Sequence, residues 1–430
     1  MLEWESGMPA HQSAVRWRII SLLFLISVVT YMDRVNIAVA GKMIMPDLGI
    51  TPVQFGLVLS AFGLGYALFQ IPGGWLADRV GPRKTLAFAL AGWSAFTAMI
   101  AVSGGSRHSS WPAAFGSLLL LRFLIGAGEA AALPNFGRTA ANWLPRSERG
   151  RGMGIAIGGI GIGSALTPPL VAGLMSRVGW RPVFAFCGGL GFAVAWVWYL
   201  LARDTPNEHP GVSPGERAWI AESGVSRDAE PEPPSSLWHL LKNRVVWYLI
   251  MSYLMLGYVA YIYLAWFYIY LVDVRHFTLL TGSYVAAAPF VAMAITCPLG
   301  GWLTDRICRR YGARAGRSGI GLTGMISTAL FLSLGAVTPD PYLSVAELSL
   351  GAGTLYLTVG AYWSGAIALS NKNSGALTGL MNMGANIGGT LSPTFTPWLG
   401  TKLGWPFALL FAAGVAGLGG ILWFGIRTPD

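Results

Sequence analysis

The sequence predicts an all-α membrane protein with twelve transmembrane helices arranged as two halves of six. Three observations lead to this fold class: an apolar composition, twelve apolar segments of membrane-spanning length, and an internal repeat. The 430 residues are 54% hydrophobic and 11% charged, with a mean hydropathy of +0.54, whereas soluble domains carry about 25% charged residues. The hydrocarbon core of a bilayer is an apolar solvent that can surround so much apolar surface.

Twelve segments are long and apolar enough to cross a bilayer, since a membrane-spanning helix needs about 20 mostly apolar residues. The expected spans are 17–40, 53–77, 85–103, 112–135, 152–175, 182–202, 245–271, 281–304, 318–337, 343–369, 375–400 and 405–426. The first span follows Arg16 and Arg18 and has no small-residue cleavage site behind it, so we interpret it as a retained helix and not as a signal peptide.

The basic residues orient these helices. If the N-terminus is cytoplasmic, 21 of the 29 Lys and Arg residues fall in cytoplasmic segments and two fall within spans. The opposite side then holds six, which are Lys42, Arg107, Arg177, Arg181, Arg275 and Lys402. Because short cytoplasmic loops are enriched in Lys and Arg, we expect both termini in the cytoplasm of a bacterium, with the helices in its inner membrane. The same asymmetry explains the net charge of +10 without a nucleic-acid partner.

The chain contains a near-copy of itself. Residues 74–79 (GWLADR) recur at 301–306 (GWLTDR), an offset of 227. Residues 163–168 (GSALTP) parallel 388–393 (GGTLSP) at an offset of 225. Two independent blocks at nearly one offset predict two halves that share one scaffold and one orientation.

The boundaries of these halves follow from composition. We expect an N-terminal half at 1–202, a cytoplasmic linker at 203–243 and a C-terminal half at 244–430. The linker is rich in Pro, Glu and Ser, which is typical of segments that bury little apolar surface. One short helix is expected within it, near Pro214–Glu222.

Two resemblances become visible at this point. Residues 74–84 (GWLADRVGPRK) resemble the signature loop of the major facilitator superfamily, with Pro82 standing where a basic residue is usual. Four further motifs resemble the anion:cation symporter family within it, namely YMDR at 31–34, LRFLIGAGE at 121–129, DTP with HP at 204–210, and NxxxN at 382–386. The resemblance implies a major facilitator fold, alternating access around a site between the halves, and anionic cargo that is usually proton-coupled.

Members of that family include bacterial permeases for galactonate, hexuronates and glucarate, and related animal carriers for sialic acid and glutamate. The family therefore implies a small organic anion as substrate. In galactonate-type permeases the residue that matches Ile160 is a glutamine that contacts substrate. The apolar side chain here puts galactonate itself in doubt.

Four ionisable residues stand out inside the expected spans: Asp33, Arg34, Arg122 and Glu129. They all belong to the N-terminal half, and the nearest carboxylate of the second half, Glu347, lies close to the outer end of its span. Each of the four costs about 2.5–3.5 kcal/mol on insertion and so needs an explanation. We predict that Asp33 and Glu129 bind the coupling protons and that Arg122 is their switching partner. Arg34 is the predicted clamp for a substrate carboxylate, since guanidinium binds carboxylate in a two-pronged fork. The alternative is a static ion-pair cluster that fixes helix packing.

Further candidate substrate contacts are polar or aromatic residues in the same spans. Asn382 and Asn386 lie four residues apart on one helix face, where the first half carries Ile157 and Gly161. The remaining candidates are Tyr31, Tyr66 and Gln70, which the resemblance places near Asp33, an aromatic group of Tyr258, Tyr261 and Trp266, and the pair Trp363 and Ser364. Interhelical hydrogen bonding and interface packing are the alternative roles.

Two matching charge clusters end the repeated motif. We predict a conformational gate of charged residues at the cytoplasmic helix ends, formed by Asp78, Arg79 and Arg83 in one half and by Asp305, Arg306 and Arg309 in the other. The plainer reading is that these residues only set the topology.

The function predicted from the sequence is therefore a monomeric proton:organic-anion symporter, and an anion uniporter or exchanger is the alternative. We expect no enzymatic activity, no metal and no cofactor besides the proton. The five histidines are scattered over loops and flanks, and the three cysteines, Cys187, Cys297 and Cys308, have no metal-ligand spacing.

Overall fold

The structure is a computed structural model that describes residues 13–103, 111–222, 242–369 and 374–426. These residues are almost entirely helical. The helices are α1 (Val15–Leu48), α2 (Pro52–Val80), α3 (Pro82–Ile100), α4 (Trp111–Glu129), α5 (Ala132–Trp143), α6 (Arg146–Val178), α7 (Trp180–Leu201), η1 (Pro206–Glu208), α8 (Pro214–Glu222), α10 (Arg244–Ala265), α11 (Phe267–Asp273), α12 (Leu279–Val285), α13 (Ala288–Tyr311), η2 (Arg314–Ser318), α14 (Gly319–Val337), α15 (Pro341–Leu357), α16 (Val359–Leu369), α17 (Ser374–Leu403), α18 (Trp405–Ile421) and η3 (Leu422–Phe424).

Each of the twelve expected spans falls on a helix or on two consecutive helices. The spans predicted at 112–135, 245–271, 281–304 and 343–369 are each divided by a short irregularity. Ten helical stretches of the described chain are long and apolar enough to cross a membrane. The other two expected spans lie on α3 and α17, where α3 opens on basic residues and α17 is interrupted by polar residues, Gly and Pro.

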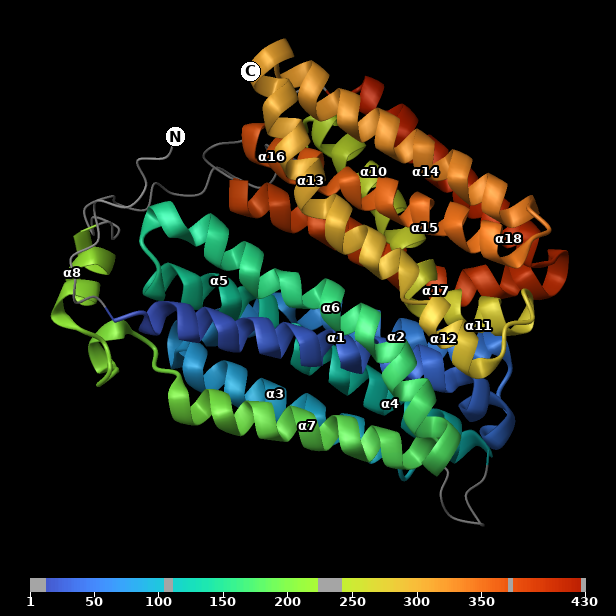
Figure 1. Ribbon diagram of the computed structural model, residues 1–430, viewed down its shortest axis with the longest axis horizontal. Coiled ribbons are helices and arrows are strands. Elements are labelled where there is room, and N and C mark those ends of the chain that lie inside the picture. The colour runs from blue at the N-terminus through green and yellow to red at the C-terminus, as the bar shows by residue number, and fades with distance from the viewer. Residues whose placement is uncertain (1–12, 104–110, 223–241, 370–373, 427–430) are drawn as a thin grey trace.

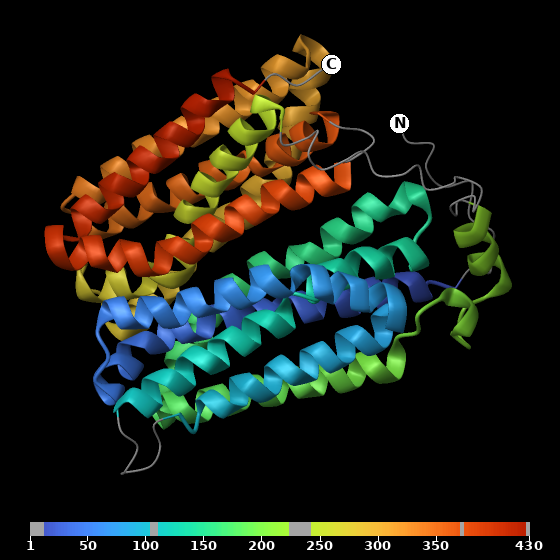
Figure 2. The same cartoon turned by 180° about the vertical axis from the view of Figure 1, so that it is seen from behind.

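The helices form two bundles, one of α1 to α7 and one of α10 to α18 (Figures 1 and 2). The repeat extends to backbone conformation. Gly179 (φ 77°) precedes α7, and Gly404 (φ 89°), at the predicted offset of 225, precedes α18. Both glycines adopt a positive φ that other residues rarely take. Equivalent helices of the two halves therefore begin with the same sharp turn.

The bundles lie closest at the end that carries α11 and α12, here called the α11 end, and diverge toward the opposite end, here called the α8 end (Figures 1 and 2). At the α11 end Lys42 of α1 forms an ion pair with Asp273 of α11. Deeper in, the Ser60 hydroxyl of α2 donates to the Thr390 carbonyl of α17 at 2.6 Å. A Cβ on Gly56 would lie 2.2 Å from a backbone oxygen of α17, so α2 and α17 meet backbone to backbone.

The helix predicted within the linker is present as α8, and it is fixed to the start of α1. Glu216 of α8 is fully buried. Its carboxylate accepts hydrogen bonds from the backbone N–H groups of Val15 and Arg16, at 3.3 and 3.1 Å, and from the Arg16 guanidinium at 3.0 Å. The same guanidinium donates to Glu148, where α6 begins. A carboxylate at a helix N-terminus also complements the helix dipole.

This contact gives a first prediction. Glu216→Ala leaves the Arg16 guanidinium without its buried partner, and breaking a buried ion pair costs about 3 kcal/mol. We expect a lower melting temperature and faster protease cleavage of the linker. The control is Glu208→Ala, because Glu208 is exposed and accepts from the nearby Thr205 hydroxyl. Equal melting and cleavage for the two variants would contradict the prediction.

Candidate functional site

The centre of the site is an ion pair inside the N-terminal bundle. Arg34 of α1 donates through Nε to Oε2 of Glu129 on α4, at 2.7 Å. The Glu129 side chain is completely buried and the Arg34 side chain is 11% exposed. The second carboxylate oxygen, Oε1, has no hydrogen-bond partner among the described residues. Glu129 therefore has unused acceptor capacity beside a guanidinium.

Aromatic rings surround the Arg34 guanidinium. Its central carbon lies 4.7 Å from the ring centre of Tyr31, 4.6 Å from that of Tyr66 and 5.0 Å from that of Phe62. Aromatic faces attract a cation and help to keep it charged in an apolar setting. The cage thus replaces part of the hydration that the guanidinium loses within the bundle.

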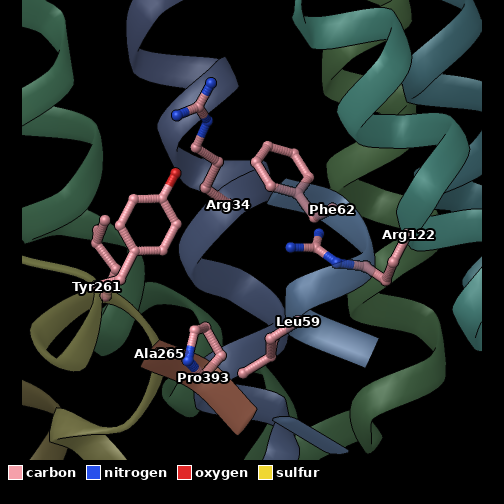
Figure 3. A pocket seen from close by; sticks show the side chains of 8 residues that line it. Arg34, Leu59, Phe62, Arg122, Tyr261, Ala265 and Pro393 are labelled. Atoms are coloured by element: carbon pink, nitrogen blue, oxygen red, sulfur yellow. The ribbon is translucent and has the colours of Figure 1, made fainter. Parts of the chain in front are cut away.

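A second guanidinium lies across Phe62. Arg122 of α4 is 3% exposed, and its central carbon lies 4.8 Å from the Phe62 ring centre. Its NH1 group donates to the backbone carbonyl of Asp33 at 3.4 Å, while Nε has no partner within the described chain. Figure 3 shows Phe62 between the two guanidinium groups, with Arg122 directed toward the cavity. Two positive groups therefore border one space.

That space is a cavity between the halves. Its lining combines Arg34, Leu59, Phe62 and Arg122 of the N-terminal bundle with Tyr261, Leu264, Ala265 and Pro393 of the C-terminal bundle. The Tyr261 hydroxyl projects on the same side as Arg34 (Figure 3). A second cavity is lined by Ser27, Thr30, Tyr31, Arg34, Ala132, Leu133, Phe136 and Ile160. Arg34 borders both cavities, and Ile160, the apolar replacement noted in the sequence, borders the second.

Asp33 lies apart from this arrangement. It is 1% exposed, and its Oδ1 accepts from Asn36 Nδ2 at 3.4 Å. Adjacent residues on a helix point about 100° apart, so Asp33 and Arg34 face different neighbours. The two predicted proton carriers, Asp33 and Glu129, therefore have different hydrogen-bond partners, although their charges interact with each other and with Arg122.

The observed ion pair involves a different arginine from the partner that the sequence predicted. Glu129 bonds to Arg34, the predicted substrate clamp, and the hydrogen bond from Arg122 reaches the backbone of Asp33 instead of a carboxylate. In this conformation Arg34 therefore holds the place that the sequence interpretation gave to Arg122. Exchange of partners by either arginine stays a prediction.

The aromatic candidates separate into two groups. Tyr31 and Tyr66 surround Arg34, and Tyr261 lines the cavity. Trp266 is completely buried, with its indole N–H donating to the Pro393 carbonyl at 2.9 Å. Tyr258 is 5% exposed and bonds to Thr396. The structure thus does not place these last two at the cavity.

The polar candidates of the C-terminal half are partly exposed or bonded locally. The Asn386 amide donates to the Asn382 backbone carbonyl at 3.0 Å on α17, and Ser364 donates to the carbonyl three residues before it. The Trp363 indole N–H donates to Tyr253 at 3.1 Å. Gln70, a candidate of the N-terminal half, is half-buried on α2. None of these five candidates contacts the Arg34 group through the hydrogen bonds of the described chain.

The predicted gate residues lie toward the α8 end, where α2 and α13 finish. Arg79 stacks on Trp75 and Arg306 on Trp302, each within its own half. Arg83 donates to the Tyr199 carbonyl. Asp305 and Arg309 are exposed, and the Asp78 side chain lies outside the described part of the structure. A gate remains a prediction.

Several residues of the site had no signal in the sequence. Phe62 resembles any other apolar residue of a span, yet it separates two guanidinium groups. Pro393 enters the cavity from α17, which only the packing of the halves reveals. Asn36 is the exception, because a polar residue three positions after Asp33 shares its helix face.

A close packing contact provides a second prediction. A Cβ on Gly389 of α17 would lie 2.5 Å from the ring of Tyr261, so Gly389→Ala pushes this ring into the cavity. We expect anion affinity to fall roughly tenfold, since small displacements of a positioned group are costly. The measurement is ligand-induced thermal stabilisation. Gly379→Ala on the same helix, where a Cβ meets nothing within 4 Å, is the matched control. An equal affinity in both variants would contradict the role of Tyr261.

Comparison with known proteins gives consistent matches. The sequence profile of the Major Facilitator Superfamily matches residues 23–315 and 308–430. A probable sulfoacetate transporter of Cupriavidus necator is 31% identical over 94% of this chain and 92% of its own. A probable galactarate/D-glucarate transporter of Escherichia coli is 30% identical over 96% and 94%, and a D-galactonate transporter of the same species 28% over 94% of each. A bacterial homologue of the human lysosomal transporter Spinster, solved in an inward-facing, unoccupied conformation, superposes with a TM-score of 0.77 at 18% identity, covering 98% of this chain and all of that one.

Proposed function

The chain belongs to the Major Facilitator Superfamily, and on that premise we propose that it is a secondary transporter that moves a small organic anion together with protons by alternating access. The observation that carries the proposal is the position of Arg34. It is a nearly buried guanidinium that borders the cavity between the halves and whose partner, Glu129, is a titratable group. A guanidinium in an aromatic setting suits a carboxylate or sulfonate ligand.

Proton binding is coupled to anion binding because Arg34 exchanges one partner for another. A proton on Glu129 removes the charge that holds Arg34, and the guanidinium then binds the carboxylate of the substrate. Loss of that proton restores the ion pair and expels the anion. Substrate and proton thus occupy the site together, which is symport. Arg122, across Phe62, adds a second positive charge to the same cavity.

Asp33 supplies a second coupling position. The membrane potential is worth about 2.3 kcal/mol per charge per 100 mV, and it drives accumulation of a monovalent anion only when more than one cation accompanies it. Asp33 and Glu129 are both buried in one bundle and have different hydrogen-bond partners. Loading of both makes the overall transfer electrogenic.

The proposed cargo follows from relatives and from the cavity lining. The matched proteins are named as transporters of sulfoacetate, galactarate or glucarate, and galactonate. Tyr31, Tyr66 and Tyr261 offer hydroxyl groups beside Arg34, whereas Ile160 offers none. We propose a sugar acid or other small carboxylate, with galactonate disfavoured. The protein acts as a monomer in a bacterial inner membrane with both termini in the cytoplasm.

The first test is thermal stabilisation of the purified protein by sugar acids, dicarboxylates, aromatic acids, acidic amino sugars and sulfoacetate, at acidic and neutral pH. We expect an anion whose effect strengthens at low pH. Stabilisation by neutral or cationic compounds alone would overturn the assignment of anionic cargo.

The alternative is an anion uniporter or exchanger that lacks proton coupling. Proteoliposomes loaded with the stabilising anion distinguish the two functions. Symport predicts accumulation against a gradient when an inward pH gradient is imposed, whereas a uniporter or exchanger equilibrates the anion at the same level with and without it.

A further inference from the structure

The second cavity beside Arg34 has a mainly apolar lining. Because α1 begins at the α8 end and the α1 residues of the lining precede Arg34, the cavity lies on the α8 side of the guanidinium. The two bundles diverge toward this end (Figures 1 and 2). The described lining from α5 and α6 is apolar throughout and consists of Ala132, Leu133, Phe136 and Ile160. An anion that reaches Arg34 from the α8 end therefore places its body against apolar side chains.

The α1 side of this cavity offers few hydrogen-bond partners for hydroxyl groups of a ligand. The Thr30 hydroxyl donates to the Ile26 carbonyl at 2.8 Å, and the Tyr31 hydroxyl accepts from Arg34 at 3.4 Å. Ser27 adds one more hydroxyl and is 2% exposed. A sugar acid carries a hydroxyl on most of its carbons, and each buried hydroxyl without a partner lowers affinity about five- to hundredfold. The cavity therefore disfavours a polyhydroxylated body.

The cavity between the halves, on the other side of Arg34, has a similar lining. Besides Arg34 and Arg122, the one polar side chain of its described lining is Tyr261. Figure 3 shows Leu59 and Pro393 across this cavity from Arg34. The charged and phenolic groups thus suit the anionic head of a ligand, and the remaining walls suit a body without hydroxyl groups.

The α6 wall of the second cavity is held tightly against α1. A Cβ on Gly159 would lie 2.4 Å from the Phe24 carbonyl oxygen, and a Cβ on Gly163 would lie 2.4 Å from that of Val28. The two helices therefore pack backbone to backbone, and this contact fixes Ile160 at the edge of the cavity. The apolar surface is thus formed before a ligand binds, as is usual for small-molecule sites.

We propose that the transported anion has an apolar body: its carboxylate or sulfonate binds Arg34, and its short aliphatic chain or ring occupies the second cavity against Leu133, Phe136 and Ile160. Removal of such a body from water favours binding, whereas a hydroxylated body loses hydrogen bonds to water that this cavity does not replace. The inference rests on the proposed function, because it names the class of anion within it, namely acids with few or no hydroxyl groups in place of sugar acids.

The test compares pairs of acids of similar skeleton by ligand-induced thermal stabilisation of the purified full-length protein at mildly acidic pH. The pairs are butyrate with threonate, its trihydroxy form, and cyclohexanecarboxylate with glucuronate, which carries its carboxylate on a hydroxylated six-membered ring. We expect the apolar acid of each pair to bind at least about tenfold more tightly, because its partner buries hydroxyls without hydrogen bonds. Butyramide, which lacks the charge, should not stabilise the protein.

A substitution in α6 tests where the apolar body lies. Ile160→Gln brings an amide donor and acceptor into the second cavity, so the preference for butyrate over threonate should shrink about tenfold. The matched control is Ile162→Gln on the same helix. Ile162 is 44% exposed and points about 200° away from Ile160, so this variant should keep the preference of the wild type.

Equal or tighter binding of threonate and glucuronate by the wild-type protein would overturn the inference and leave anion transport in place. An equal change of preference in Ile160→Gln and Ile162→Gln would also overturn it, because the body would then lie elsewhere. Stabilisation by no carboxylate or sulfonate at all would overturn the proposed function together with the inference.

Discussion

Replacement of Arg34 by alanine is expected to abolish anion binding. Arg34 is the group that we assign to the carboxylate of the substrate, and removal of one partner from a buried, hydrogen-bonded charge pair costs about 2–5 kcal/mol. Affinity should therefore fall at least about thirtyfold, measured as loss of ligand-induced thermal stabilisation and of anion counterflow in proteoliposomes.

Two further variants test whether the loss of anion binding is specific to the Arg34 guanidinium. Arg34→Lys keeps the charge but not the two-pronged fork, and we expect intermediate binding. Arg181→Ala is the matched control, because Arg181 is a partly exposed arginine at the α11 end that pairs with Asp47. It should bind the anion as the wild type does. Binding of wild-type strength in Arg34→Ala would place the anion elsewhere.

The second large effect is expected from Glu129→Gln. The amide cannot take up or release the proton, but it still accepts a hydrogen bond from Arg34, so the variant mimics the protonated state. Accumulation driven by a pH gradient should be abolished while some counterflow exchange persists. Counterflow and pH-driven uptake in the same proteoliposomes separate these two activities.

The companion variant is Asp33→Asn, for which we expect the same loss of pH-driven accumulation with some remaining exchange. Glu347→Gln, on α15 of the C-terminal half, is the control and should accumulate the anion normally. Undiminished accumulation in both Glu129→Gln and Asp33→Asn would show that these carboxylates do not couple anion transport to protons.

Much of the architecture follows from the sequence alone. The apolar spans, their number and the repeat can be read from hydropathy and from local sequence pattern. These local signals are sufficient in a bilayer because the backbone polar groups of a spanning segment must be satisfied within its own helix. The sequence also identified the four costly charges and the short helix at Pro214–Glu222. These features are local, so neighbouring residues suffice to predict them.

Contacts between distant segments were decided by the tertiary structure. Arg34 and Glu129 are 95 residues apart, and Glu216 lies 200 residues from the Arg16 that it binds. The sequence showed two arginines and two carboxylates, and only helix packing determined that Arg34 bonds to Glu129 while Asp33 accepts a hydrogen bond from Asn36. Phe62 and Pro393 reach the cavity for the same reason. The cost of inserting a charged residue into the membrane depends on that residue alone, whereas the partner of the charge depends on how the helices pack.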